Sequence, residues 1–173
     1  MMVSIIFIVA IVSAISFSLI NNSGTSRSVN KKDQVHYHAI FQVYLDNQLV
    51  NFGKSKYMHV QYCTQGEMTQ EQQEDEQAEK AHLHDNIGDV VHVHRNNATW
   101  GDLLINLKHQ VPGEAVGYIN GEKVDNIFTT KIKADDRALI LIEDYTDIQG
   151  KLDKLPSIDR IRQTVKKSQS CSK

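Results

Sequence analysis

Three segments of the sequence predict an α+β domain, in which a mixed sheet packs against a helix. Residues 35–45 alternate strictly between two sets of side chains, which is typical of a strand with one buried face. The continuous apolar run at residues 137–142 predicts a central strand that is covered on both faces. Residues 99–102, Thr-Trp-Gly-Asp, have the spacing of a capping box and predict the start of a helix with a leucine stripe.

The rest of the 173-residue chain divides by composition. Residues 1–20 are uncharged and apolar and, as a helix about 30 Å long, reach across a bilayer. We interpret them as a membrane anchor or uncleaved signal, in preference to a removed signal peptide. Residues 21–33 follow as a polar spacer, and residues 144–173 as a helical C-terminal tail. The expected protein is therefore single-pass in the cell membrane, with its domain on the extracytoplasmic side.

The histidine-rich α+β domain is expected at residues 34–143, and residues 64–80 form an acidic Gln/Glu-rich insertion in it. The formal net charge of −2 argues against nucleic acid as a partner. The two cysteines, Cys63 and Cys171, permit one disulfide and exclude a disulfide scaffold. The expected partners are the membrane and a metal ion.

The stretch of residues 82–94, HLHDNIGDVVHVH, has a His-x-His pair at each end. In a strand the side-chain period is two, so each pair points to one face. A hairpin loop of three residues would place His84 opposite His92 and His82 opposite His94, with all four on one face. An even loop would point the two pairs apart. We favour the odd loop because it also stacks the intervening apolar residues on the other face.

A third pair, His36 and His38, begins the strand at residues 35–45, and a strand at residues 57–62 would place His59 on its polar face. Neutral imidazole is a preferred ligand of zinc, copper and nickel. The pattern therefore predicts a site for a divalent transition metal, with copper or zinc favoured. The predicted ligands are His36, His38, His82, His84, His92 and His94.

Two further residues are candidate contributors to this site, and one histidine is excluded from it. His59 is one contributor, and Asp85 is the other, either orienting an imidazole through its second ring N–H or closing the turn. His109 is expected in the last turn of the helix, where its charge would complement the helix dipole.

Three alternatives stay open for the function. The histidines could be the solvated face of a half-buried sheet, which has no ligand. They could hold zinc for a hydratase or hydrolase, with water in the open position. They could also form a pH-responsive interaction module that charges below about pH 6.

Several motifs together resemble a family of small extracytoplasmic histidine-rich domains of bacteria and archaea. They are the leading His-x-His strand, Leu-His-x-His-Asp, Val-His-Val-His, Thr-x-Gly-Asp-Leu-Leu, and an Ile-Asn-Gly-Glu-Lys hairpin before Asp-Asp-Arg-Ala-Leu-Ile-Leu-Ile. The resemblance covers about residues 34–155. Residues 99–143 are also similar to a β-grasp, which implies a sheet packed on one helix. The sulfur-carrier members of that fold end in Gly-Gly, whereas this chain ends Ser-Cys-Ser-Lys, so that role is not expected.

Overall fold

The computed structural model describes residues 34–59, 77–109, 111 and 114–168. The predicted membrane segment, the spacer and most of the predicted insertion lie outside these ranges. Among the residues that the structure describes, no helix is long and apolar enough to cross a membrane.

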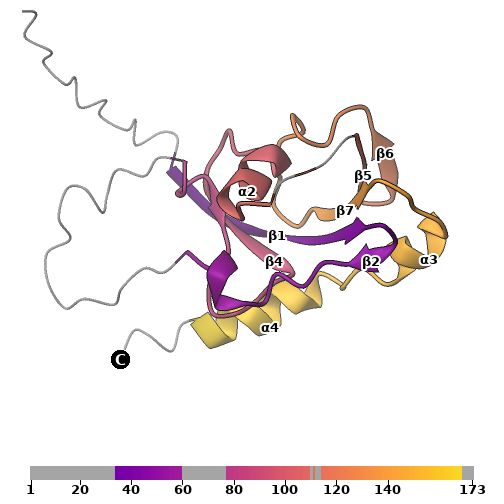
Figure 1. Ribbon diagram of the computed structural model, residues 1–173. Coiled ribbons are helices and arrows are strands. Elements are labelled where there is room, and N and C mark those ends of the chain that lie inside the picture. The colour runs from indigo at the N-terminus through magenta and orange to yellow at the C-terminus, as the bar shows by residue number, and fades with distance from the viewer. Residues whose placement is uncertain (1–33, 60–76, 110, 112–113, 169–173) are drawn as a thin grey trace, which may run out of the picture.

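One mixed sheet contains strands from both halves of the chain (Figure 1). The strand order is β3-β4-β1-β7-β5-β6, and the short β2 pairs with the end of β1. β1 and β7 are parallel, and the other pairs are antiparallel. The α+β prediction is confirmed, and the expected central strand β7 lies between β1 and β5. The strands are β1 (Gln34–Leu45), β2 (Gln48–Leu49), β3 (Ala81–His82), β4 (Val90–Arg95), β5 (Ala115–Ile119), β6 (Glu122–Val124) and β7 (Arg137–Ile142).

Helix α2 (Trp100–Asn106) begins as the sequence predicts. The Thr99 hydroxyl accepts a hydrogen bond from the Asp102 N–H, and the Asp102 carboxylate accepts one from the Thr99 N–H at 2.9 Å. These reciprocal contacts satisfy two backbone donors that the first turn of a helix leaves without partners.

The strand predicted at residues 57–62 is wrong in its described part. Tyr57 ends a 3-10 helix, η2 (Ser55–Tyr57), and Met58 makes only an isolated parallel bridge to Leu83. The following residue continues this contact, because the His59 N–H donates to the Leu83 carbonyl oxygen at 2.7 Å. The segment thus borders the sheet beyond β3, although it forms no regular strand.

The larger core lies between α2 and one face of the sheet. Leu83, Val91, Val93 and Phe41 are all fully buried there, as the alternating pattern predicts. α2 contributes Trp100, Leu103 and Leu104, and its C-cap residue Leu107 follows them. These apolar groups require the residues that alternate with them in β1 and β4 to point to the opposite face.

Helix α4 (Asp159–Ser168) covers part of that opposite face (Figure 1). Its Ile161 and Val165 pack against Ile40 of β1 and Val90 of β4. Helix α3 (Ile148–Asp153) precedes it, and Leu155 between the two helices packs on β7 through Leu139 and Leu141. The C-terminal helices therefore form a layer on the sheet.

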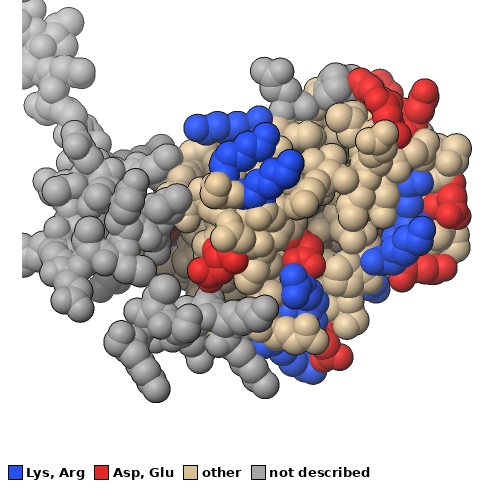
Figure 2. All heavy atoms as spheres, turned by 60° about the horizontal axis from the view of Figure 1, so that its bottom comes forward, with Lys and Arg blue, Asp and Glu red and all other residues tan. Residues whose placement is uncertain are grey.

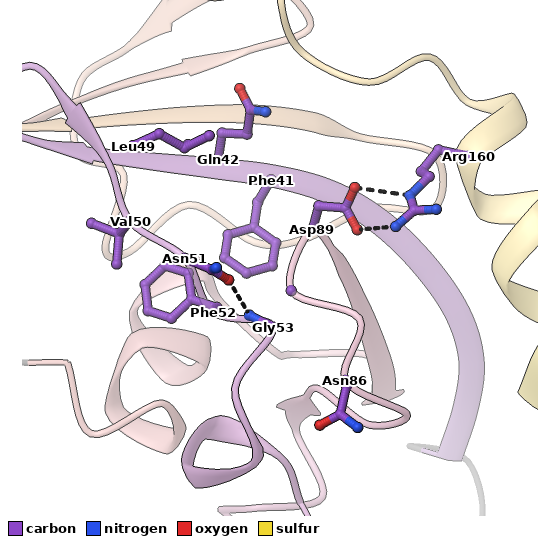
Figure 3. A pocket seen from close by; sticks show the side chains of 11 residues that line it. Phe41, Gln42, Leu49, Val50, Asn51, Phe52, Gly53, Asn86, Asp89 and Arg160 are labelled. Carbon is purple, nitrogen blue, oxygen red and sulfur yellow. Dashed lines mark hydrogen bonds and ion pairs between the residues drawn. The ribbon is translucent and has the colours of Figure 1, made fainter.

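An ion pair fixes the start of α4. The Arg160 guanidinium donates two hydrogen bonds to the Asp89 carboxylate, at 2.9 and 3.0 Å, just before β4 begins (Figure 3). In Figure 2, which turns the α4 side toward the viewer, acidic and basic side chains lie in several separate groups with neutral surface between them.

A hollow of about 360 Å³ lies beside this ion pair, where β1 changes its neighbour from β4 to β2 (Figure 3). Gly88 and Gly53 meet at its wall. A Cβ on Gly88 would lie 2.3 Å from the Gly53 nitrogen, so only glycine permits this close approach of the two loops. This contact fixes the loop between β3 and β4 against the segment after β2.

Burial of Leu83 gives the first prediction. Leu83→Ala should lower the free energy of unfolding by about 2–5 kcal/mol, because it opens a cavity between α2 and the sheet. Leu49→Ala is the matched control, since Leu49 is 52% exposed and should change stability by less than about 0.5 kcal/mol. Urea denaturation followed by circular dichroism measures both. Equal losses in the two variants would contradict this description of the core.

Candidate metal centre

The pairing of three adjacent strands places three histidines in a row. His38 of β1 lies opposite His92 of β4, and His92 lies opposite His82 of β3. The side chains of Ile40 and Val90, two residues away on the same strands, pack under α4. The histidines therefore lie on the α4 side of the sheet, on the face opposite α2.

The predicted register of the central hairpin is wrong by two residues, although its parity is right. His82, rather than His84, lies opposite His92. The physical reason is a larger loop: Asp85 and Asn86 both adopt positive φ, and the Ile87 N–H closes a turn on the His84 carbonyl oxygen at 3.1 Å. Ile87 is then buried in the core under α4. A shift of two keeps all the pairs on one face, so the cluster survives.

Seven of the eight histidines are linked by ring-to-ring contacts. The centroids of contacting rings are between 3.6 and 6.2 Å apart. The structure thus brings together all six predicted ligands and the additional candidate His59. The cluster, called here the histidine face, consists of His36, His38, His59, His82, His84, His92 and His94.

Three of these residues, His36, His38 and His92, form a triad that could hold a metal ion, because one ring nitrogen from each lies within 4.8 Å of the other two. Nitrogen ligands around a tetrahedral ion with bonds of 2.0–2.1 Å are about 3.3 Å apart, so binding requires some of these nitrogens to approach by up to about 1.5 Å. His38 Nε2 and His92 Nδ1 are 2.9 Å apart and share a proton. A metal ion could take the place of this hydrogen bond if the donor ring carried its proton on its other nitrogen instead.

The triad is open on one side. His36 is exposed, His38 is half-buried and His92 is 4% exposed. All three residues belong to strands of the sheet, and exposed His36 would leave an ion held here with a coordination position within reach of solvent.

Two histidines beside the triad have their ring orientation fixed by acceptors. His82 Nδ1–H donates to the Ala78 carbonyl oxygen at 2.9 Å, and His84 Nδ1–H donates to the Asp85 carboxylate at 2.7 Å. An acceptor on Nδ1 leaves the Nε2 lone pair of the neutral ring available to a metal. The contact predicted for Asp85 is therefore present, whereas Ala78 carries no signal in the sequence because its backbone makes the contact.

Burial keeps the central imidazoles neutral. It lowers the pKa of His92 to about 2, that of His82 to about 3 and that of His38 to about 4, and neighbouring histidines lower each pKa further. The pKa of His94 is also lowered, mainly by burial. Neutral imidazole is the form that binds metals, so His38, His82 and His92 are in their ligand form well below neutral pH.

The end of the predicted insertion is part of the structure around the cluster. Residues 77–80 form a half-buried turn. The Lys80 ammonium pairs with the Asp102 carboxylate of α2 at 2.8 Å, and the Lys80 carbonyl accepts from the His94 N–H. This turn also presents the Ala78 carbonyl to His82.

His109 is the histidine outside the cluster, as predicted, but the reason given for it is wrong. It lies three residues beyond the end of α2 and its ring packs edge-on against Phe52 in the α2-side core. Burial lowers the pKa of His109, which disfavours the charged form that an interaction with the helix dipole would need.

No protein-family model, curated protein or solved structure matches this chain. The fold and the site alone therefore define its class: an α+β protein with a mixed sheet, one face of which carries a cluster of imidazoles.

The lowered pKa values give the second prediction, for metal-free protein. Below about pH 6.5 the unfolded chain binds protons that buried His82 and His92 do not bind in the folded state. The free energy of unfolding should therefore fall from about pH 6.5 toward pH 4, by up to about 1.4 kcal/mol per pH unit for each such histidine. Above about pH 7 these groups are neutral in both states and contribute no pH dependence.

Urea denaturation in the presence of a chelator, at steps between pH 7.5 and pH 4.5, measures this effect. The control is the double variant His82→Asn and His92→Asn, which keeps a polar side chain at each position but removes the titrating group. Its stability should depend less steeply on pH. If the free energy of unfolding fell equally steeply with pH in the parent and the variant, these two histidines would be protonated in the folded state.

Proposed function

We propose that this protein binds a divalent transition metal ion, zinc or copper, through His36, His38 and His92. The observation that carries the proposal is the triad itself, three imidazole nitrogens within 4.8 Å of one another on two paired strands. The low pKa values of His38 and His92 add to it, because the ligands need not lose protons at neutral pH.

A fourth ligand can come from the same face. The His84 ring centroid is 3.6 Å from that of His92, and the His94 centroid is 4.9 Å from that of His36. His84 is the better candidate, because the Asp85 carboxylate accepts its Nδ1–H and so leaves Nε2 available to the ion. The other two predicted ligands, His82 and His94, lie beside the triad on the same face.

A site for binding is favoured over the other two candidate functions. The pH-responsive module needs histidines that gain charge near pH 6. Burial lowers the pKa of His38, His82 and His92 well below that pH, and it also lowers the pKa of His94. A zinc hydratase or hydrolase remains the second candidate, because the exposed side of the triad leaves a position for water. Turnover of carbon dioxide or of a model ester by zinc-loaded protein distinguishes catalysis from binding.

We also propose a β-grasp-like arrangement for the domain and its relation to the extracytoplasmic histidine-rich family. The arrangement is supported by the central parallel pair β1 and β7 and by α2, which follows β4 and packs across one sheet face. The relation rests on the motifs of the sequence, above all the three His-x-His pairs.

The third prediction tests metal binding. The double variant His38→Ala and His92→Ala should lose high-affinity zinc and copper(II) binding, because it removes the two triad ligands that share a proton. His109→Gln is the control, since it also removes a histidine but lies on the other side of the sheet, and it should bind as the parent does. Calorimetric titration of metal-free protein gives the affinities. Equal affinity of parent and double variant would show that the triad is only a solvated sheet face.

The fourth prediction tests the proposed location. If residues 1–20 tether the chain and the domain is extracytoplasmic, protease added to intact cells should digest the domain that begins near residue 34. A cytoplasmic protein probed in the same sample is the control and should survive. Protection of the domain until the membrane is broken would place it on the other side.

A further inference from the structure

We infer that His59 and His82 form a second metal position, at the edge of the sheet beyond β3. Neither residue belongs to the triad, which consists of His36, His38 and His92. This inference rests on the proposed function, because it also assumes that the protein binds metal ions. Its ligands are not those of the triad, so an experiment can contradict the second position without contradicting the first.

Strand alternation places His59 and His82 on the same side. Met58 bridges Leu83 in parallel, and both side chains pack toward the core under α2. The next residue along, His59, therefore points to the histidine face, and its backbone N–H is fixed by the Leu83 carbonyl at 2.7 Å. His82 precedes Leu83 and points to the same face.

The spacing of the two rings suits a shared ion. Their centroids are 4.8 Å apart. Two imidazoles that bind one tetrahedral ion through bonds of 2.0–2.1 Å have centroids about 5 Å apart. The contact of His82 Nδ1–H with the Ala78 carbonyl leaves its Nε2 as the metal-binding atom, and that contact also fixes the plane of the ring.

The surroundings provide room for the ion and its remaining ligands. His59 and His82 both line a hollow of about 290 Å³, which α2 closes on one side with Asn106. Water or a small anion can complete the coordination there. Exposed Lys56 and Lys108 also border the hollow and repel a cation, so this ion should bind more weakly than the one in the triad.

His94 connects the two positions. Its ring is stacked on that of His82 with centroids 5.0 Å apart, and on that of His36 with centroids 4.9 Å apart.

The experiment counts ions in the full chain, purified in detergent and freed of metal. Zinc is titrated against a chromophoric chelator, and native mass spectrometry gives the stoichiometry. We expect two ions in the parent, the second bound at least about tenfold more weakly than the first. His59→Ala should keep the first ion and lose the second, whereas His109→Gln should keep both.

Nuclear magnetic resonance of the histidine rings provides a measurement that needs no variant. The second equivalent of zinc should shift the ring signals of His59 and His82, after the first has shifted those of the triad. Two ions bound equally well by parent and His59→Ala would overturn the inference, as would a second shift confined to the triad. One ion in both would overturn it while leaving the proposed function intact. No ion in the parent would overturn the proposed function as well.

Discussion

The constraint on which the rest of the site depends is the pairing of β1, β4 and β3. His38, His92 and His82 lie directly opposite one another, because each strand buries its other set of side chains under α2. A slip of one residue in any pair would exchange a histidine for a buried apolar side chain. The apolar core therefore fixes the register, and the register places the imidazoles.

The same packing makes protonation of the imidazoles unfavourable. Burial lowers the pKa of His38, His82 and His92, and every further charge on the face would repel the next. A metal ion is bound by nitrogen lone pairs, and each neutral ring has one such lone pair. The rings could therefore bind an ion without first losing a proton. Their remaining N–H groups need acceptors, and Ala78 and Asp85 supply two of them. Contacts of this kind fix the orientation of a ring and of the lone pair on its other nitrogen.

The helix α4 limits where the histidine face begins. Its Ile161 and Val165 cover Ile40 and Val90, which belong to the same rows of side chains as His38 and His92. The Arg160–Asp89 ion pair holds the start of this helix at the loop before β4. One continuous sheet face is thus divided into an apolar part under α4 and an imidazole part beside it, and the imidazole part includes exposed His36.

The sequence by itself determined which side chains share a face. Alternation in residues 35–45 and in the Val-His-Val-His segment was enough to predict buried Phe41, Val91 and Val93 and the common direction of the His-x-His pairs. It was also enough for the start of α2, because capping is a local interaction between Thr99 and Asp102. These features depend on backbone periodicity and on neighbours within one turn, so one stretch of chain contains all the information.

Only the tertiary structure decided which histidines are neighbours. The hairpin between β3 and β4 is shifted by two residues because Asp85 and Asn86 form a turn that buries Ile87 under α4, a helix some 70 residues later in the chain. The Ala78 carbonyl accepts a hydrogen bond from His82 because the ion pair of Lys80 with α2 holds that turn in place. His59 lies beside His82 because its backbone N–H donates to the Leu83 carbonyl oxygen. Backbone atoms and long-range packing leave no pattern in the sequence. For that reason the sequence predicts the face on which the imidazoles lie, and only the folded chain determines the triad.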